Sequence, residues 1–158
     1  MSQSLAQAGL FAWLCSRYDN RVLKTAGEVL MKLGYTILYV RDVEASLNFF
    51  ENAFGLQRRF YHESGYGEVE TGITALGFAS HELGASNLPD GYIKADASTV
   101  PLGMEVALVT EDVQTAFHKA LSAGAYSIRE PMNKPWGQTV AYVRCPDGLL
   151  VELCSPVS

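Results

Sequence analysis

Residues 33–56 read LGYTILYVRDVEASLNFFENAFGL, and residues 102–125 read LGMEVALVTEDVQTAFHKALSAGA, which is a second version of the same pattern. Each copy opens with an apolar run of strand type, passes through an Asp-Val pair, and continues with apolar residues at helical spacing to a glycine. Asp42 and Asp112 are placed to cap the two helices, and each closing glycine to end its helix in the left-handed conformation. The repeat therefore predicts two strand–helix units of one design.

Three shorter strand-like segments follow each predicted helix. They cover residues 57–63, 67–72 and 73–80 in the first half, and residues 125–130, 138–144 and 149–155 in the second half. A connector rich in Gly, Pro and Asp, residues 86–101, separates the two halves. We predict an α+β fold of two βαβββ modules, at about residues 33–92 and 102–156.

The composition limits the classes of function. The 158 residues are 48% hydrophobic and 18% charged, as expected for one globular domain. The net charge of −5 and the lack of a basic cluster argue against nucleic-acid binding, and no apolar run approaches the roughly 18 residues of a membrane span. Cys15, Cys145 and Cys154 form no CxxC pair, so we predict reduced thiols and a cytoplasmic location.

The segment before the first strand differs from the rest of the chain. Residues 1–30 are apolar in part, but no Lys or Arg precedes the apolar stretch and no clean cleavage site follows it, which argues against a signal peptide. We interpret residues 1–30 as a helical extension that packs on the domain or on a partner subunit. The domain proper is predicted to occupy residues 31–158.

The doubled βαβββ pattern, the two strand–Asp-Val–helix openings and the closing CPDGLLVEL at residues 145–153 resemble the vicinal oxygen chelate superfamily. That superfamily includes glyoxalase I, extradiol dioxygenases and binding proteins of the bleomycin-resistance type. The resemblance covers about residues 32–156. It implies that the modules curve a mixed sheet around a cup with helices on the outer face, that a small molecule binds in the cup, and that the chain forms a homodimer.

The resemblance also implies where a metal would bind. Metal-dependent members of the superfamily place His, Gln or Glu on the first and last strand of each module, facing the cup. Here the four positions fall on Tyr35, near Gly77, on Glu105 and on Glu152. Two carboxylates alone suit weak binding of Mg²⁺ or Mn²⁺ and not a typical Zn²⁺ site. We therefore predict no cofactor and no tightly bound metal, with weak divalent binding by Glu105 and Glu152 left open.

Strand alternation places Glu152 on the cup face and its neighbours Val151 and Leu153 on the helix face. The neighbouring strand presents Glu105 to the same cup. The alternative is that Glu152 is simply solvated on an open sheet face. Trp136 lies between Pro135 and Gly137, and there it either covers a ligand or plugs the fold. The predicted ligand-binding residues are Tyr35, Tyr39, Phe78, Glu105, Trp136, Gln138 and Glu152.

Two functions from different classes remain open. The first is a metal-free binding protein of the bleomycin-resistance type that holds a partly aromatic, cationic or amine-bearing compound against the acidic cup. The second is a glyoxalase-like or dioxygenase-like lyase or isomerase that uses Glu105 and Glu152 as weak metal ligands or as a general base. Two carboxylates held close together raise one pKa, which suits a general base.

Overall fold

The computed structural model describes residues 31–157, so the predicted extension at residues 1–30 lies outside the described part of the chain. The first module contains β1 (Tyr35–Val40), α2 (Val43–Phe54), β2 (Arg58–His62), β3 (Tyr66–Val69) and β4 (Ala75–Ser80). Between the two modules lie α3 (His81–Asn87) and the 3₁₀ turn η2 (Ala95–Ala97). The second module contains β5 (Glu105–Val109), α4 (Val113–Ser122), β6 (Tyr126–Asn133), β7 (Thr139–Arg144) and β8 (Leu150–Cys154). The predicted order of strand, helix and three strands is confirmed in both modules.

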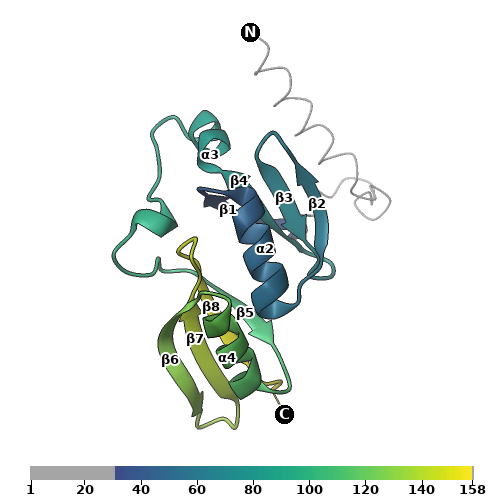
Figure 1. Ribbon diagram of the computed structural model, residues 1–158, viewed down its shortest axis with the longest axis vertical. Coiled ribbons are helices and arrows are strands. Elements are labelled where there is room, and N and C mark those ends of the chain that lie inside the picture. The colour runs from purple at the N-terminus through teal and green to yellow at the C-terminus, as the bar shows by residue number, and fades with distance from the viewer. Residues whose placement is uncertain (1–30, 158) are drawn as a thin grey trace.

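Each module has its own four-stranded mixed sheet, in the order β1-β4-β3-β2 and β5-β8-β7-β6. The first strand of each module runs parallel to the last, and the other pairs are antiparallel. Figure 1 shows the first module above the second, with α2 and α4 end to end in front of the sheets. The α+β fold of two modules is confirmed, and the described strands form two separate sheets without backbone pairing between them.

The helix ends form as the sequence predicts. Asp42 and Asp112 each accept a hydrogen bond of 2.9 Å from the backbone N–H three residues further on, which satisfies a free donor at the helix start. Gly55 ends α2 with φ of 72°, in the left-handed region that favours glycine. Ala123 is the C-cap residue of α4, and Gly124, which follows it, has φ of 112°.

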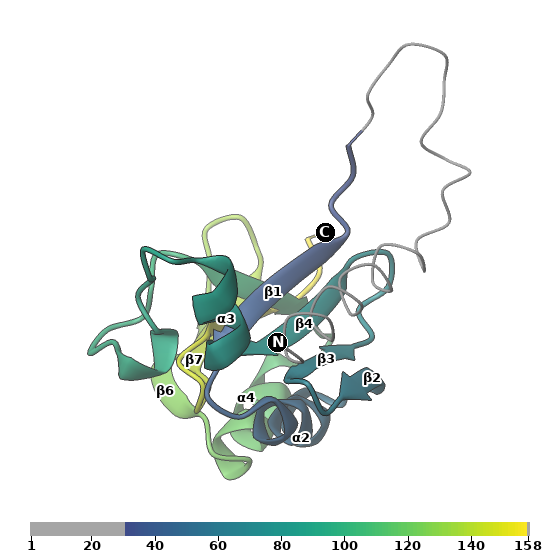
Figure 2. The same ribbon diagram turned by 90° about the horizontal axis from the view of Figure 1, so that it is seen from above.

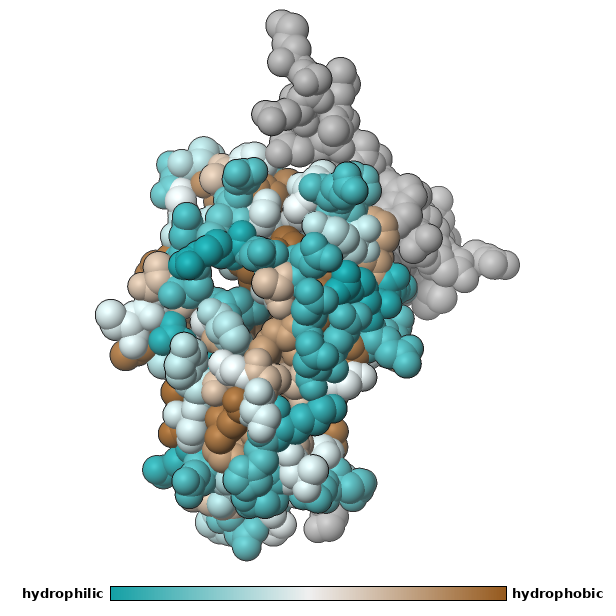
Figure 3. All heavy atoms as spheres, in the orientation of Figure 1, coloured by the Kyte–Doolittle hydropathy of each residue, from teal (hydrophilic) through white to brown (hydrophobic). Residues whose placement is uncertain are grey.

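The main core lies between the helices and one face of each sheet. Leu47 and Phe50 of α2 are fully buried, and Phe117 of α4 is 3% exposed. α2 and α4 also contact each other, so a single core joins the modules (Figure 2). In Figure 3 hydrophilic residues cover most of this helix-bearing face, with apolar residues between them near the middle of the molecule. This face is therefore the outer, solvated side of the molecule.

Phe78 belongs to this core, and our prediction that it lines the cup is wrong. Its side chain is fully buried, and its ring centroid lies 4.8 Å from that of Phe50. Alternation along β4 gives the reason, because Gly77 faces the open side of the sheet and the next residue must face α2. Phe78 therefore stabilises the packing of α2 on its sheet and cannot reach a ligand on the opposite face.

The short helix α3 departs from the expectation that all helices lie on the outer face. Leu83 of α3 is 4% exposed and packs with Tyr66 and Ala79, whose side chains lie on the face opposite α2. Ser80 caps this helix by accepting a 3.2 Å hydrogen bond from the Leu83 N–H. Seven residues that include Gly and Ser give a weak helical pattern, which is why sequence reasoning assigned no helix there.

The connector is fastened to both modules. Asp96 accepts from Arg41 at 2.8 Å and lies 3.1 Å from His81 Nε2, which ties it to the first module. Arg144 of β7 donates to the carbonyls of Ala95 at 2.8 Å and Ser98 at 2.7 Å, which ties it to the second. Burial alone would raise the pKa of Asp96, but its contacts with His81 and Arg41 outweigh burial and the pKa is lowered. No helix within residues 31–157 is long and apolar enough to cross a membrane.

Candidate functional site

The second sheet presents an acidic pair on the face that α4 leaves open. On β8, Val151 is fully buried and Leu153 is 2% exposed against the helix layer, whereas Glu152 is half-buried on the other face. Glu105 begins β5 and is exposed on the same open face. The predicted orientation of Glu152 therefore agrees with the structure, and the two carboxylates face the same side of adjacent strands.

The two carboxylates influence each other and a neighbouring phenol. Partial burial raises the pKa of Glu105, and the negative charge of Glu152 and a hydrogen bond to it raise that pKa further. Tyr142 of β7 pairs with Glu152 across the sheet, and its hydroxyl donates to Glu152 Oε1 at 3.3 Å. Burial and both carboxylates raise the pKa of Tyr142. The cluster therefore favours protonated forms, and it can hold a proton or a cation between its oxygens.

Tyr142 was not among the predicted site residues. The signal was present in the sequence, because the turn at residues 145–149 makes β7 and β8 a hairpin. Counting outward from that turn pairs position 142 with 152. Assigning the register of this hairpin from the sequence would have identified Tyr142 as the neighbour of Glu152.

Trp136 and Gln138 lie in the tight turn that joins β6 to β7. The Lys134 carbonyl accepts from the Gly137 N–H at 2.9 Å, and Gly137 has φ of 89°, so Pro135 and Trp136 occupy the centre of the turn. The indole of Trp136 is 60% exposed, and its Nε1 donates to Gln138 Oε1 at 3.1 Å. Gln138 Nε2 donates to the Ser155 carbonyl at 2.7 Å. The amide of Gln138 therefore orients the indole, which is too exposed to be a buried plug.

The first sheet has no acidic pair at the corresponding positions. A Cβ atom on Gly77 would lie 2.7 Å from the hydroxyl oxygen of Tyr66, so the phenol occupies the space of the missing side chain. Tyr66 is 2% exposed, and its hydroxyl has no hydrogen-bond partner at ordinary geometry. Burial raises the pKa of Tyr66 strongly, and the nearby charge of Glu68 and a weak interaction of the hydroxyl with that carboxylate, outside ordinary hydrogen-bond geometry, raise it further. Glu68 itself is 4% exposed and lies 3.6 Å from Arg59.

Tyr35 and Tyr39 lie on the same face of β1 and are both half-buried. The ring of Tyr39 packs at 4.9 Å from that of Tyr92 in the connector. Tyr35 lies close enough to Tyr66 to influence its pKa. The structure therefore places the predicted aromatics of the first module on the open face, where Tyr39 is covered in part by the connector.

The donor set does not fit a tightly bound transition metal. Within residues 31–157 no group of three or more His, Cys, Asp or Glu side chains is arranged to hold a metal ion. The last-strand position of the first module is Gly77, and the Tyr66 phenol fills the volume above it. A buried phenol with a raised pKa is a poor ligand, because the metal binds the ionised form. Glu105 and Glu152 remain the available carboxylates of this face.

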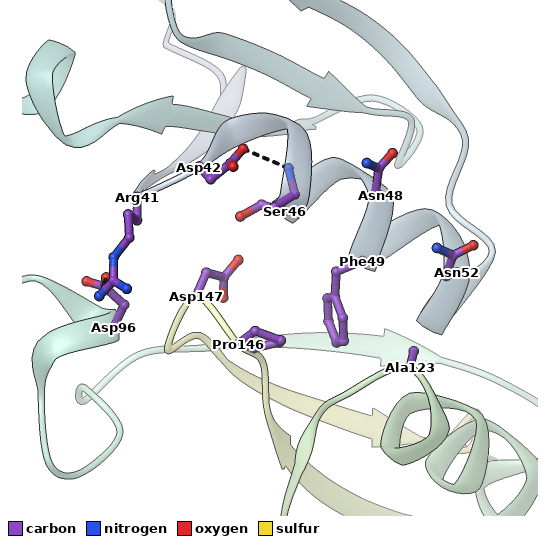
Figure 4. A pocket seen from close by; sticks show the side chains of 11 residues that line it. Arg41, Asp42, Ser46, Asn48, Phe49, Asn52, Asp96, Ala123, Pro146 and Asp147 are labelled. Carbon is purple, nitrogen blue, oxygen red and sulfur yellow. Dashed lines mark hydrogen bonds and ion pairs between the residues drawn. The ribbon is translucent and has the colours of Figure 1, made fainter.

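A separate hollow of about 520 Å³ lies on the helix side of the molecule. It is lined by Arg41, Asp42, Ala45, Ser46, Asn48, Phe49, Asn52, Asp96, Ala123, Pro146 and Asp147. Figure 4 shows the charged residues at one end and Phe49, Asn52 and Ala123 at the other. Neither Glu105 nor Glu152 lines this hollow.

The three aspartates of the hollow take part in structural contacts. Asp42 caps α2, and Asp96 is bound by Arg41 and His81. Asp147 accepts the Leu149 N–H at 3.1 Å within the turn between β7 and β8, although its Oδ2 atom is buried without a partner. Burial raises the pKa of Asp147. The hollow is thus the junction of α2, the connector and this turn, and we place the candidate site at the acidic pair.

The doubled βαβββ architecture with an open sheet face defines a class of small-molecule-binding folds whose chemistry varies with the side chains on that face. A model of the Glyoxalase/Bleomycin resistance protein/Dioxygenase superfamily matches residues 32–153. The chain therefore belongs to this superfamily, and the resemblance noted in the sequence is confirmed.

Individual relatives agree with this assignment. The chain is 31% identical over 127 residues to the uncharacterized protein YwbC of Bacillus subtilis (strain 168), covering 77% of this chain and 94% of that protein. A glyoxalase-related enzyme from Fulvimarina pelagi is 19% identical, with a TM-score of 0.69 over 80% of this chain and 89% of that chain. A glyoxalase/bleomycin resistance protein/dioxygenase family enzyme from Burkholderia phytofirmans PsJN is 20% identical, with a TM-score of 0.69 over 81% of this chain and all of that chain. At these identities the two structures support the fold alone.

Proposed function

We propose that this chain is a small-molecule binding protein of the bleomycin-resistance type that holds an amine-bearing, partly aromatic ligand without a tightly bound metal. The observation that carries the proposal is the pair Glu105 and Glu152 on the open sheet face, with no third His, Cys, Asp or Glu of residues 31–157 placed to complete a metal site. An ammonium group between the two carboxylates would remove their repulsion. Burial raises the pKa of Glu105, and the nearby charge of Glu152 raises it further.

The surroundings of the pair supply the aromatic part of the proposal. Tyr142 lies directly beside Glu152, and Trp136 projects from the turn at the end of the same sheet. Aromatic rings around a few convergent polar groups are the usual composition of a small-molecule site. An aromatic amine can therefore contact the rings and the carboxylates at once.

Calorimetry with benzylamine tests the proposal on the full-length protein. Glu105→Gln and Glu152→Gln should each weaken benzylamine binding by about tenfold, the usual size of a lost charged hydrogen bond. Glu111→Gln is the matched control, because it removes the same charge from an exposed residue beyond the end of β5 and should leave binding unchanged. Equal binding by all four proteins would contradict the proposal.

Native mass spectrometry of freshly purified protein tests the metal-free part. We expect no transition metal at one ion per chain. Close to one Zn²⁺, Ni²⁺ or Fe per chain, lost in Glu105→Gln or Glu152→Gln, would overturn this part and favour an enzyme.

The raised pKa of Glu105 favours one alternative, a lyase or isomerase of the glyoxalase or dioxygenase type that uses this residue as a general base. A base beside the Tyr142 hydroxyl could remove a carbon-bound proton next to a carbonyl. Exchange of the carbon-bound hydrogens of dihydroxyacetone with D₂O, followed by NMR, separates the two functions. Exchange above background that Glu105→Gln abolishes would support the enzyme, and background exchange would support the binding protein.

A further inference from the structure

Lys134 occupies an unusual position at the border of the candidate site. Its Nζ lies 5.7 Å from the centre of the Trp136 ring and 6.0 Å from the centre of the Tyr142 ring. The turn fixes this arrangement, because the Lys134 N–H donates to the Gln138 carbonyl at 2.8 Å and Gln138 orients the indole. The lysine is therefore held between two aromatic side chains, one of which bonds to Glu152.

The charge of Lys134 has no anionic partner in the described part of the chain. No Asp or Glu oxygen of residues 31–157 lies within ion-pair distance of its Nζ, although the side chain is half-buried. Aromatic faces attract an ammonium group, but they do not replace the strong acceptors that its three N–H groups lose on leaving water. An ammonium held beside two aromatic rings without an anionic partner gains a strong acceptor from an incoming anion.

We propose that Lys134 binds an anionic group of the ligand, so that the ligand of this site is amphoteric, with an amine at the carboxylate pair and a carboxylate at Lys134. This inference rests on the proposed function of the acidic pair and names the second half of the ligand. Tyr142 sets the geometry, because its ring faces Lys134 while its hydroxyl donates to Glu152. A cationic group over the face of Tyr142 and an anionic group at its hydroxyl thus lie beside one aromatic side chain, which suits a ligand with both charges on a single ring.

Three probes that share one ring test the inference. These are 4-(aminomethyl)benzoate, which carries both charges, benzylamine, which carries the amine alone, and 4-methylbenzoate, which carries the carboxylate alone. We expect 4-(aminomethyl)benzoate to bind about tenfold more tightly than benzylamine in a ligand-observed NMR titration, as for one added charged hydrogen bond. Lys134→Met should remove this advantage and leave benzylamine unchanged, and Lys134→Arg should retain most of it.

Each result separates this inference from the proposed function. If benzylamine binds in a manner that Glu152→Gln weakens, but the carboxylate adds nothing or its advantage survives in Lys134→Met, the role of Lys134 is overturned and the proposed function stands. If 4-methylbenzoate binds as tightly as the amphoteric probe and Glu152→Gln changes neither, the amine site is overturned and the anion site at Lys134 stands. If no probe binds, both are overturned.

Discussion

The replacement of Gly77 by alanine tests whether the Tyr66 phenol fills the space above Gly77 on the open face of the first sheet. The added Cβ would lie 2.7 Å from the Tyr66 hydroxyl oxygen and 3.2 Å from Cζ, closer than packed atoms normally approach. Forcing one extra carbon into a filled space costs about 1–3 kcal/mol, and the lower entropy of an unfolded chain with alanine returns about 0.4–1 kcal/mol. Gly77 does not have positive φ, so its backbone tolerates alanine. We expect Gly77→Ala to lower the free energy of unfolding by about 1–2 kcal/mol.

Tyr66→Phe should act in the opposite direction. The hydroxyl is buried without a partner, so its removal should raise the free energy of unfolding by about 1 kcal/mol. In this background the nearest atom to the new Cβ is gone, and Gly77→Ala should cost no more than about 0.5 kcal/mol. Urea unfolding followed by circular dichroism measures all four proteins of the cycle, with Gly103→Ala as a control because a Cβ there meets no atom within 4 Å.

Two results would refute this account of the first sheet. A loss of stability in Tyr66→Phe would mean that the hydroxyl has a partner. Additive effects of the two substitutions, within about 0.5 kcal/mol, would mean that the phenol does not occupy the space above Gly77.

Four further outcomes follow from the structure. Burial raises the pKa of Asp147, so the contribution of this group to stability is present below its ordinary value of 3.8 and is lost as pH rises through the folded pKa. Urea unfolding should therefore show that the free energy of unfolding of Asp147→Asn increases relative to that of the wild type as pH rises through that window. A difference in free energy that does not change with pH would contradict this. Gly148→Ala should lower the melting temperature, because Gly148 has φ of 90° and a Cβ atom there would overlap the backbone of Ala95. An unchanged melting temperature would mean that the connector is not held against Gly148. Glu105→Gln should raise the thermal stability of the empty protein at neutral pH or leave it unchanged, since it removes a like-charge contact, and a clear loss would speak against repulsion in the pair. We propose a homodimer, since both described sheets have open ends to their strand order and such edges are commonly closed by association. A clean monomer at micromolar concentration in sedimentation velocity would rule it out.

The doubled module could be predicted because its signals are local. Asp42 and Asp112 cap helices by contacts three residues away, and each apolar period is read within a single segment. The face of Glu152 was also predictable, because alternation along a strand needs no knowledge of its neighbours. Once Gly77 is assigned to the open face, the same rule places its neighbour Phe78 in the core. The prediction that Phe78 lines the open face therefore applied the rule inconsistently.

The remaining site residues depend on contacts between distant segments. Tyr66 fills the space above Gly77 only through the register of β3 with β4, and Lys134 meets the Tyr142 ring only through the geometry of the turn at Trp136. A side-chain position of this kind depends on register, rotamer and turn type together, and a single sequence gives each of these with limited precision. The cluster that joins carboxylates, phenol and ammonium therefore emerged from the structure.

The connector gives the molecule a fixed spacing between its two halves. Asp96 is held by Arg41 and His81 of the first half, and the carbonyls beside it are held by Arg144 of the second, so the same few residues bridge both. The sheets share no backbone hydrogen bonds in the described chain, so this bridge and the contact of α2 with α4 set how far apart they stand. Lengthening or shortening the bridge would widen or narrow the span between the sheets without changing the residues on their strands. A duplicated fold of this type can thus accommodate ligands of different length by changing the segment between its halves.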